Sequence, residues 1–117
     1  MKYSVIYITT LAILSSCTWR NEISFEIENM SKFQIDSLKI EANDNKNDEF
    51  ISLKSNESKD YILDMNDIIK VDGFYNLSYK INGDKRFHNF GYYTNGAPSE
   101  RFVEIKISAD SASTQIN

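Results

Sequence analysis

Side chains that perform acid–base or nucleophilic chemistry are scarce in this chain of 117 residues. There is one cysteine, Cys17, and one histidine, His88. A hydrolase with a serine nucleophile needs a histidine base beside it, and no Gly-x-Ser-x-Gly segment marks such a serine. His88 lies between Arg86 and Phe90 on the more apolar side of an alternating segment, which is typical of a half-buried structural histidine. We therefore expect no catalytic residue; an enzyme that processes glycans with two acidic side chains is the alternative from another class.

Metal-binding chemistry has two possible locations, and both are acidic loops. A zinc site needs clustered cysteine or histidine ligands, which one residue of each type does not provide. Acidic and amide side chains gather in residues 42–49, with Asp44, Asp48 and Glu49, and in residues 64–72, with Asp64, Asn66, Asp67 and Asp72. Calcium takes several loop oxygens, but the first stretch has Lys46 where an EF-hand needs an oxygen and lacks the central glycine. We interpret both stretches as solvated loops, with calcium binding as the alternative, and expect no metal or other cofactor.

The segment 90–100, FGYYTNGAPSE, has the composition of a binding loop. Tyr92, Tyr93 and Asn95 combine flat rings with adaptable hydrogen-bonding groups, which suits contact with a protein partner or stacking on a sugar ring. We predict these three residues as a partner-binding site. The alternative is that one or both tyrosines close the bottom of the core.

The amino-terminal stretch predicts how the chain is exported and anchored. A positive start at Lys2 precedes an apolar run over residues 3–14, too short to cross a bilayer and suited to a secretory signal. Leu14, Ser15, Ser16 and Cys17 then follow in direct succession. This order resembles the lipobox of bacterial lipoproteins, in which an apolar residue and two small residues precede a cysteine. The resemblance implies cleavage after residue 16 and acylation of Cys17.

Acylation of Cys17 would place the protein in the bacterial cell envelope, at its periplasmic or outer face. Each buried methylene contributes about 0.8 kcal/mol, so two or more acyl chains hold a protein firmly on a membrane. Residues 17–21 would form a tether whose four residues after Cys17 reach about 15 Å when fully extended. We therefore expect the folded domain to lie close to the lipid.

The body of the chain alternates apolar and polar residues with a period of two, as strands with one wet face do. Seven segments show this pattern: 22–29, 32–41, 49–54, 60–65, 73–81, 84–93 and 101–108. Seven short strands separated by turn residues predict an all-β fold, an antiparallel β-sandwich of about seven strands spanning residues 22–109. Residues 110–117 predict a polar tail.

Two local patterns refine this prediction. The apolar phase slips between Ile35 and Leu38, which predicts a bulge or bend. Asn82-Gly83 stands between two alternating runs, and this pair is the strongest short signal for a hairpin because both residues must accept positive φ.

The segment Gly73–Tyr79 carries a second resemblance. Its Gly-x-Tyr-x-Leu order is similar to a strand of immunoglobulin-like and transthyretin-like sandwiches. In those folds the tyrosine, here Tyr75, bonds back to the backbone after a corner. The Cys–Trp–Cys core of true immunoglobulin domains is absent, so the resemblance implies an architecture and no function.

Net charge excludes one class of partner. The chain carries 13 bases and 17 acids; without residues 1–16, which contain only Lys2, 12 bases face 17 acids, a net charge of about −5. Phosphate binding needs a basic surface, so we expect no nucleic-acid partner.

We predict a membrane-anchored, non-catalytic binding or accessory module with a protein or glycan partner. An envelope inhibitor or immunity lipoprotein is the alternative within binding proteins.

Overall fold

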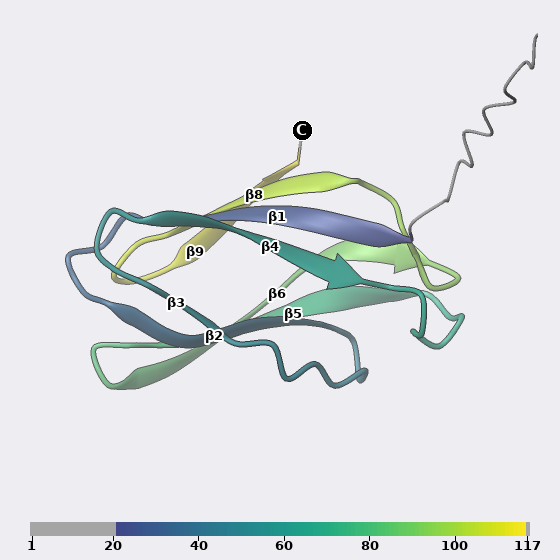
Figure 1. Ribbon diagram of the computed structural model, residues 1–117, viewed down its shortest axis with the longest axis horizontal. Coiled ribbons are helices and arrows are strands. Elements are labelled where there is room, and N and C mark those ends of the chain that lie inside the picture. Colours follow the sequence, from purple (N-terminus) through teal and green to yellow (C-terminus); the bar gives the residue numbers. More distant parts are fainter. Residues whose placement is uncertain (1–20, 117) are drawn as a thin grey trace, which may run out of the picture.

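The structure is a computed structural model that describes residues 21–116 (Figure 1). The predicted signal segment, the lipobox and Cys17 lie outside the described residues. Within the described part the fold is all-β, as the alternating pattern predicts.

Nine strands form within residues 21–116, and all seven predicted segments are among them. They are β1 (Glu22–Asn29), β2 (Ile35–Ala42), β3 (Ile51–Leu53), β4 (Ser58–Asp64), β5 (Gly73–Ile81), β6 (Asp84–Thr94), β7 (Ala97–Pro98), β8 (Phe102–Ile107) and β9 (Ala112–Ile116). The two additional strands are β7, which is only two residues long, and β9.

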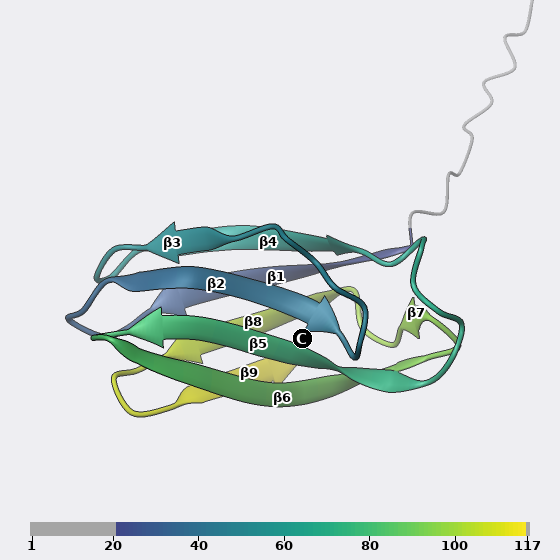
Figure 2. The same cartoon turned by 90° about the horizontal axis from the view of Figure 1, so that it is seen from below.

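The strands form two sheets that pack face to face (Figure 2). One sheet has the order β4-β1-β8-β9 and the other has the order β3-β2-β5-β6-β7. The prediction of a purely antiparallel sandwich is corrected at one pair, because β1 and β8 run parallel. Parallel neighbours need a long crossover, and here the five strands of the second sheet, together with β4, lie between them in the sequence.

The carboxy-terminal segment corrects a second expectation. Residues 110–117 predict a polar tail, but β9 pairs antiparallel with β8 from Ala112 opposite Ile107 to Ile116 opposite Val103. A tight turn precedes it, in which the Ser108 N–H donates to the Ser111 carbonyl at 2.8 Å. An edge strand needs only one apolar face, and Ala112 packs against the core.

The predicted bulge and hairpin are both present. The register of β2 against β5 shifts between Asp36 and Lys39, and Ser37 inside this shift has a φ of 54°. Asn82 and Gly83 have φ values of 52° and 82° and join β5 to β6. Positive φ at both positions matches the type I′ turn, whose twist fits the flanking strands.

The core lies between the inner faces of the two sheets, and aromatic rings fill one part of it. Tyr75 packs with ring centroids 5.7 Å from Phe25, 5.7 Å from Phe90 and 5.5 Å from Tyr93. The backbone hydrogen bond that the resemblance implies for Tyr75 is not formed, since its buried hydroxyl has no partner among the described residues. Tyr75 is therefore a core ring rather than a corner clamp.

Candidate functional site

The structure separates the three residues of the predicted binding loop. Tyr92 is 52% exposed and Asn95 is exposed, whereas Tyr93 is fully buried with its hydroxyl over Gly73. A buried ring does not meet a partner, so Tyr93 belongs to the core, as the alternative interpretation has it. Tyr92 and Asn95 remain on the surface.

Asp72 organises the surface part of this loop. The Asn95 N–H donates to Asp72 Oδ1 at 2.9 Å, and the Tyr92 hydroxyl donates to Oδ2 at 3.4 Å. The Gly96 N–H donates to the Val71 carbonyl at 3.0 Å, which ties the turn to the segment that follows β4. The hydroxyl of Tyr92 and the backbone N–H of Asn95 are therefore already engaged within the domain.

The two acidic stretches of the sequence meet in one pocket of about 570 Å³. Its lining includes Asp48, Glu49, Asp64 and Asp67, together with Lys46. Within residues 21–116, however, no group of three or more acidic, histidine or cysteine side chains is arranged to hold a metal ion. The acidic side chains surround a shared pocket without forming a coordination cage.

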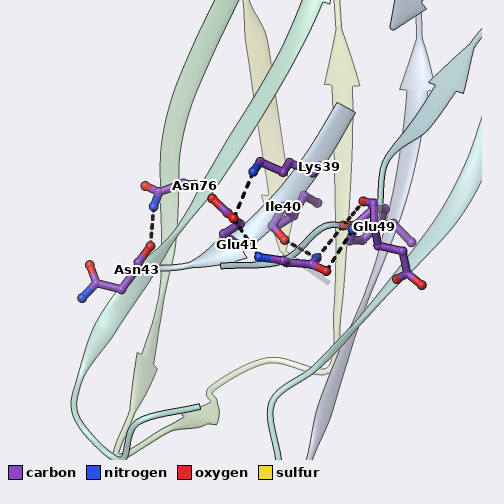
Figure 3. Close-up of polar contacts among 8 residues, drawn as sticks. Lys39, Ile40, Glu41, Asn43, Glu49 and Asn76 are labelled. Carbon is purple, nitrogen blue, oxygen red and sulfur yellow. Dashed lines mark hydrogen bonds and ion pairs between the residues drawn. The ribbon is translucent and has the colours of Figure 1, made fainter. Parts of the chain in front are cut away.

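Tyr61 fixes the loop that lines this pocket, through bonds that involve Ile40 and Glu49, both labelled in Figure 3. Its hydroxyl donates to the Glu49 carbonyl at 2.7 Å and accepts from Asn47 Nδ2, also at 2.7 Å. Asn47 also donates to the Ile40 carbonyl at 2.9 Å. These bonds hold the β2–β3 connection against β4, and burial raises the pKa of the Tyr61 hydroxyl.

A groove on the outer face of the five-stranded sheet is a second concave site, and sequence reasoning missed it. It has a volume of about 490 Å³ and lies across β2, β5 and β6. Phe50, which is 53% exposed, and Phe87, which is 71% exposed, line it. Exposed phenylalanines beside a concave surface are a common sign of a ligand site.

Strand register sets the floor of this groove, which we call the outer groove. Adjacent outward positions form three rows across β2, β5 and β6: Lys39–Ser78–Phe87, Glu41–Asn76–Asn89 and Asp36–Lys80–Lys85. The rows alternate with inward core positions, as the pleat requires. The floor thus combines a ring with hydroxyl, amide and charged groups.

Internal contacts hold several of these side chains in place (Figure 3). Lys39 Nζ lies 3.1 Å from Glu41 Oε2, which also accepts the Asn47 N–H at 2.8 Å. Asn76 Nδ2 donates to the Asn43 carbonyl at 2.9 Å. The negative charge of Glu41 is therefore engaged inside the protein.

Positive charge remains at one end of the outer groove. Lys80 lies directly opposite Lys85 in the β5–β6 ladder, an arrangement of like charges that destabilises a sheet. Asp36 lies opposite Lys80 on the other side, and its carboxylate, which also accepts a hydrogen bond from Gln34 at 2.9 Å, offsets one of the two positive charges in this row. The ammonium groups of Lys39 and Lys85 also lie 5.1 Å and 5.7 Å from the ring centroids of Phe50 and Phe87. The charged residues that line the outer groove are three lysines, Lys39, Lys80 and Lys85, and one acid, Glu41, so its lining carries more positive than negative charge.

His88 occupies the place that its sequence context predicts. It lies opposite Leu77, is half-buried, and stacks on Phe90 with centroids 5.9 Å apart and planes 15° apart. These contacts give the ring a packing role beside the core.

Comparisons with known proteins place no family on this chain: no family model matches it, and no curated protein matches it either. In the part of the chain that the structure describes, no helix is long and apolar enough to pass through a membrane.

Proposed function

We propose that this protein is a lipid-anchored, non-catalytic binding module of the bacterial envelope, and that the outer groove binds an anionic glycan. The anchoring part rests on the Leu14–Cys17 lipobox. The binding part rests on the outer groove, where two exposed phenylalanine rings stand beside a hydrogen-bonding, cationic floor.

The exposed rings are the observation that carries the binding proposal. An aromatic ring in water gains free energy when it packs on another apolar surface, and the C–H faces of sugar rings provide one. Asn76, Ser78 and Asn89 lie on the floor with amide and hydroxyl groups suited to sugar hydroxyls. Rings with a few polar groups are the usual composition of a ligand site.

The charge of the ligand follows from Lys80 and Lys85. The two lysines are neighbours in the β5–β6 ladder, and an anion bound between their side chains would lower the repulsion between the like charges. A carboxylate or phosphate on a sugar supplies such an anion.

The choice of a glycan over an extended peptide follows from the geometry of the sheet. A peptide that adds to a sheet uses the free backbone groups of an edge strand. The outer groove lies on the face of the sheet over β2, β5 and β6 and is lined by their outward side chains, whereas the outer edge of β6, which β7 pairs only at Tyr93 and Thr94, is a separate feature. The face offers side chains alone, which suits a ligand with many hydroxyl groups.

The test is calorimetric titration of the full-length lipidated protein in detergent micelles. Oligogalacturonate is the anionic probe, neutral oligogalactose of equal length is its control, and oligoglutamate represents an acidic protein segment. We expect the first probe to bind best, and we expect Phe87→Ala to weaken binding about tenfold or more, the effect of losing about 1.4 kcal/mol. Lys85→Gln should weaken binding and flatten its salt dependence.

Met30→Ala is the matched control, because Met30 is an exposed apolar residue outside the outer groove, and it should leave binding unchanged. Equal binding of the neutral sugar would contradict the ionic part of the proposal. Preferential binding of oligoglutamate would favour the inhibitor or immunity alternative, with an acidic protein surface in the same groove. If Phe87→Ala bound the probe as tightly as the unchanged protein, the outer groove would not be the binding site.

A further inference from the structure

We propose that one end of the sandwich docks into the lipid surface through Ile69 and Val71, with Tyr92 at the rim. This inference rests on the lipid anchor at Cys17 proposed above, and it adds an orientation that the anchor alone does not supply. The three residues form what we call the apolar end.

The apolar end lies where the chain enters the domain. Asn21 Nδ2 donates to the Met65 carbonyl at 3.1 Å and to the Gly96 carbonyl at 2.9 Å. Gly96 in turn binds Val71 and packs closely on Lys70, whose Cδ lies 3.0 Å from the position of an added Cβ. Figures 1 and 2 both show the start of β1 and the connection after β4 at the same end of the molecule. Asn21, the first residue that the structure describes, and the apolar end therefore lie at the same end of the domain.

The exposure of this segment is selective. Met65 is buried and Ile68 packs against the core, but Ile69 is 63% exposed and Val71 is 47% exposed. A tight turn, in which the Val71 N–H donates to the Ile69 carbonyl at 2.8 Å, holds the two side chains in this outward segment. Apolar residues close together in the sequence thus differ in burial, and Ile69 and Val71 are not part of the core cluster.

The length of the tether identifies what covers the pair. Cys17 is four residues from Asn21, a distance of at most about 15 Å, so acyl chains on Cys17 keep this end of the domain at the bilayer. Apolar side chains held at a bilayer surface gain free energy by entering the headgroup region. A second copy or a soluble partner would have to enter the same narrow space between the domain and the lipid.

The charges around the pair indicate the kind of lipid. Lys70 lies between the two apolar residues, and Asp67 and Asp72 flank them. Asp72 is engaged by the Asn95 N–H and the Tyr92 hydroxyl. One cation between two acids gives no attraction to an anionic surface, so docking should depend on the apolar contact and occur on a zwitterionic membrane.

The test is site-specific fluorescence on the full-length lipidated protein in phosphatidylcholine vesicles. The chain has one cysteine, which the lipid occupies, so Ile69→Cys provides a single thiol for an environment-sensitive dye. Met30→Cys is the matched control, because Met30 is also exposed and follows β1 at its far end, eight residues from Glu22. We expect a blue-shifted emission at position 69 that a lipid-borne nitroxide quenches, and neither effect at position 30.

The outcomes separate this inference from the proposed anchor. Protein that the vesicles do not retain would contradict the lipid on Cys17 and overturn docking with it. Retained protein whose dye at position 69 is as water-exposed as at position 30 would overturn docking alone. A blue shift without quenching by the lipid nitroxide would show a protein contact and would also overturn it.

Discussion

Buried tyrosine hydroxyls in this domain have two different environments. The hydroxyl of Tyr61 is hydrogen-bonded to the Glu49 carbonyl and to Asn47, whereas those of Tyr75 and Tyr93 have no partner among the described residues. A buried polar group without a partner keeps its desolvation cost. Removing a hydroxyl should therefore have opposite effects at positions 61 and 75.

Tyr61→Phe is expected to lower the free energy of unfolding by about 1–2 kcal/mol, since it leaves the Glu49 carbonyl and the Asn47 amide without their shared partner. Tyr75→Phe keeps the ring and its packing, so it should be neutral or stabilising. Urea unfolding of both variants checks this contrast. A larger loss in Tyr75→Phe than in Tyr61→Phe would contradict the assigned environments.

The pH dependence of stability follows from the same hydroxyls. Burial raises the pKa of Tyr75, with the nearby charge of Glu100 adding to it, and burial also raises the pKa of Tyr61, Tyr79 and Tyr93. A phenol with a raised pKa in the folded state contributes stability that is complete below its ordinary value of about 10 and is lost at higher pH.

We expect the free energy of unfolding to fall above about pH 10, by up to about 1.4 kcal/mol per pH unit for each tyrosine that stays neutral in the fold. Urea unfolding between about pH 8 and about pH 11, with tyrosinate absorbance recorded in parallel, measures this loss. Tyr75→Phe should show a shallower decline. If all the tyrosines ionised in the folded protein near their ordinary pKa, the expected loss of stability at high pH would be contradicted.

The loop tyrosines show what a residue pattern leaves undetermined. Strict alternation from buried Phe90 would place Tyr92 inside and Tyr93 outside. The structure has the reverse, because the β5–β6 register shifts at this point and Gly91 adopts a φ of 70°. One extra residue in a strand exchanges its two faces, and the sequence alone does not locate it. The structure thus removes Tyr93 from the predicted binding site.

At the scale of elements, strands with a clear alternation of apolar and polar residues could be predicted from the sequence, whereas strands with little alternation could not. The seven predicted strands are all present, as are the slip near Ser37 and the Asn82-Gly83 hairpin. β7 has only two residues, and β9 is rich in small polar residues, so neither shows enough alternation of apolar and polar residues to be recognised as a strand. Both are edge strands, which lie at the periphery of the core and therefore bury fewer apolar side chains than central strands.

Removal of β9 tests whether this strand is part of the domain. Truncation after Asp110 would expose the edge of β8 along the whole Ala112–Ile116 ladder. At about 0.5–1.5 kcal/mol net for each lost hydrogen bond, we expect unfolding to require roughly 2–4 kcal/mol less. Thermal unfolding and size-exclusion chromatography should show a lower midpoint and association through the open edge. A truncated chain as stable and monomeric as the full chain would support the polar tail instead.

At the scale of the whole molecule, the outer groove and the apolar end are separate sites with a fixed relation. β5 begins at Gly73, next to the apolar end, and Ser78 in the outer groove lies five residues further along it. With the apolar end on the lipid, the outer groove would stand on the side of the domain, open to ligands beside the membrane. The groove could not be predicted from the sequence because it is formed by residues from three different strands. Which of these residues become neighbours depends on the strand register, which is known only from the fold.

The central claim is that lipid on Cys17 holds this sandwich at a membrane. Intact-mass spectrometry of the native protein, extracted from its cells with detergent, tests it most directly. We predict a chain that begins at Cys17 and carries the additional mass of two or three acyl chains. A chain that retains Met1 and has an unmodified thiol at Cys17 would contradict the anchor, and with it the orientation proposed for the domain.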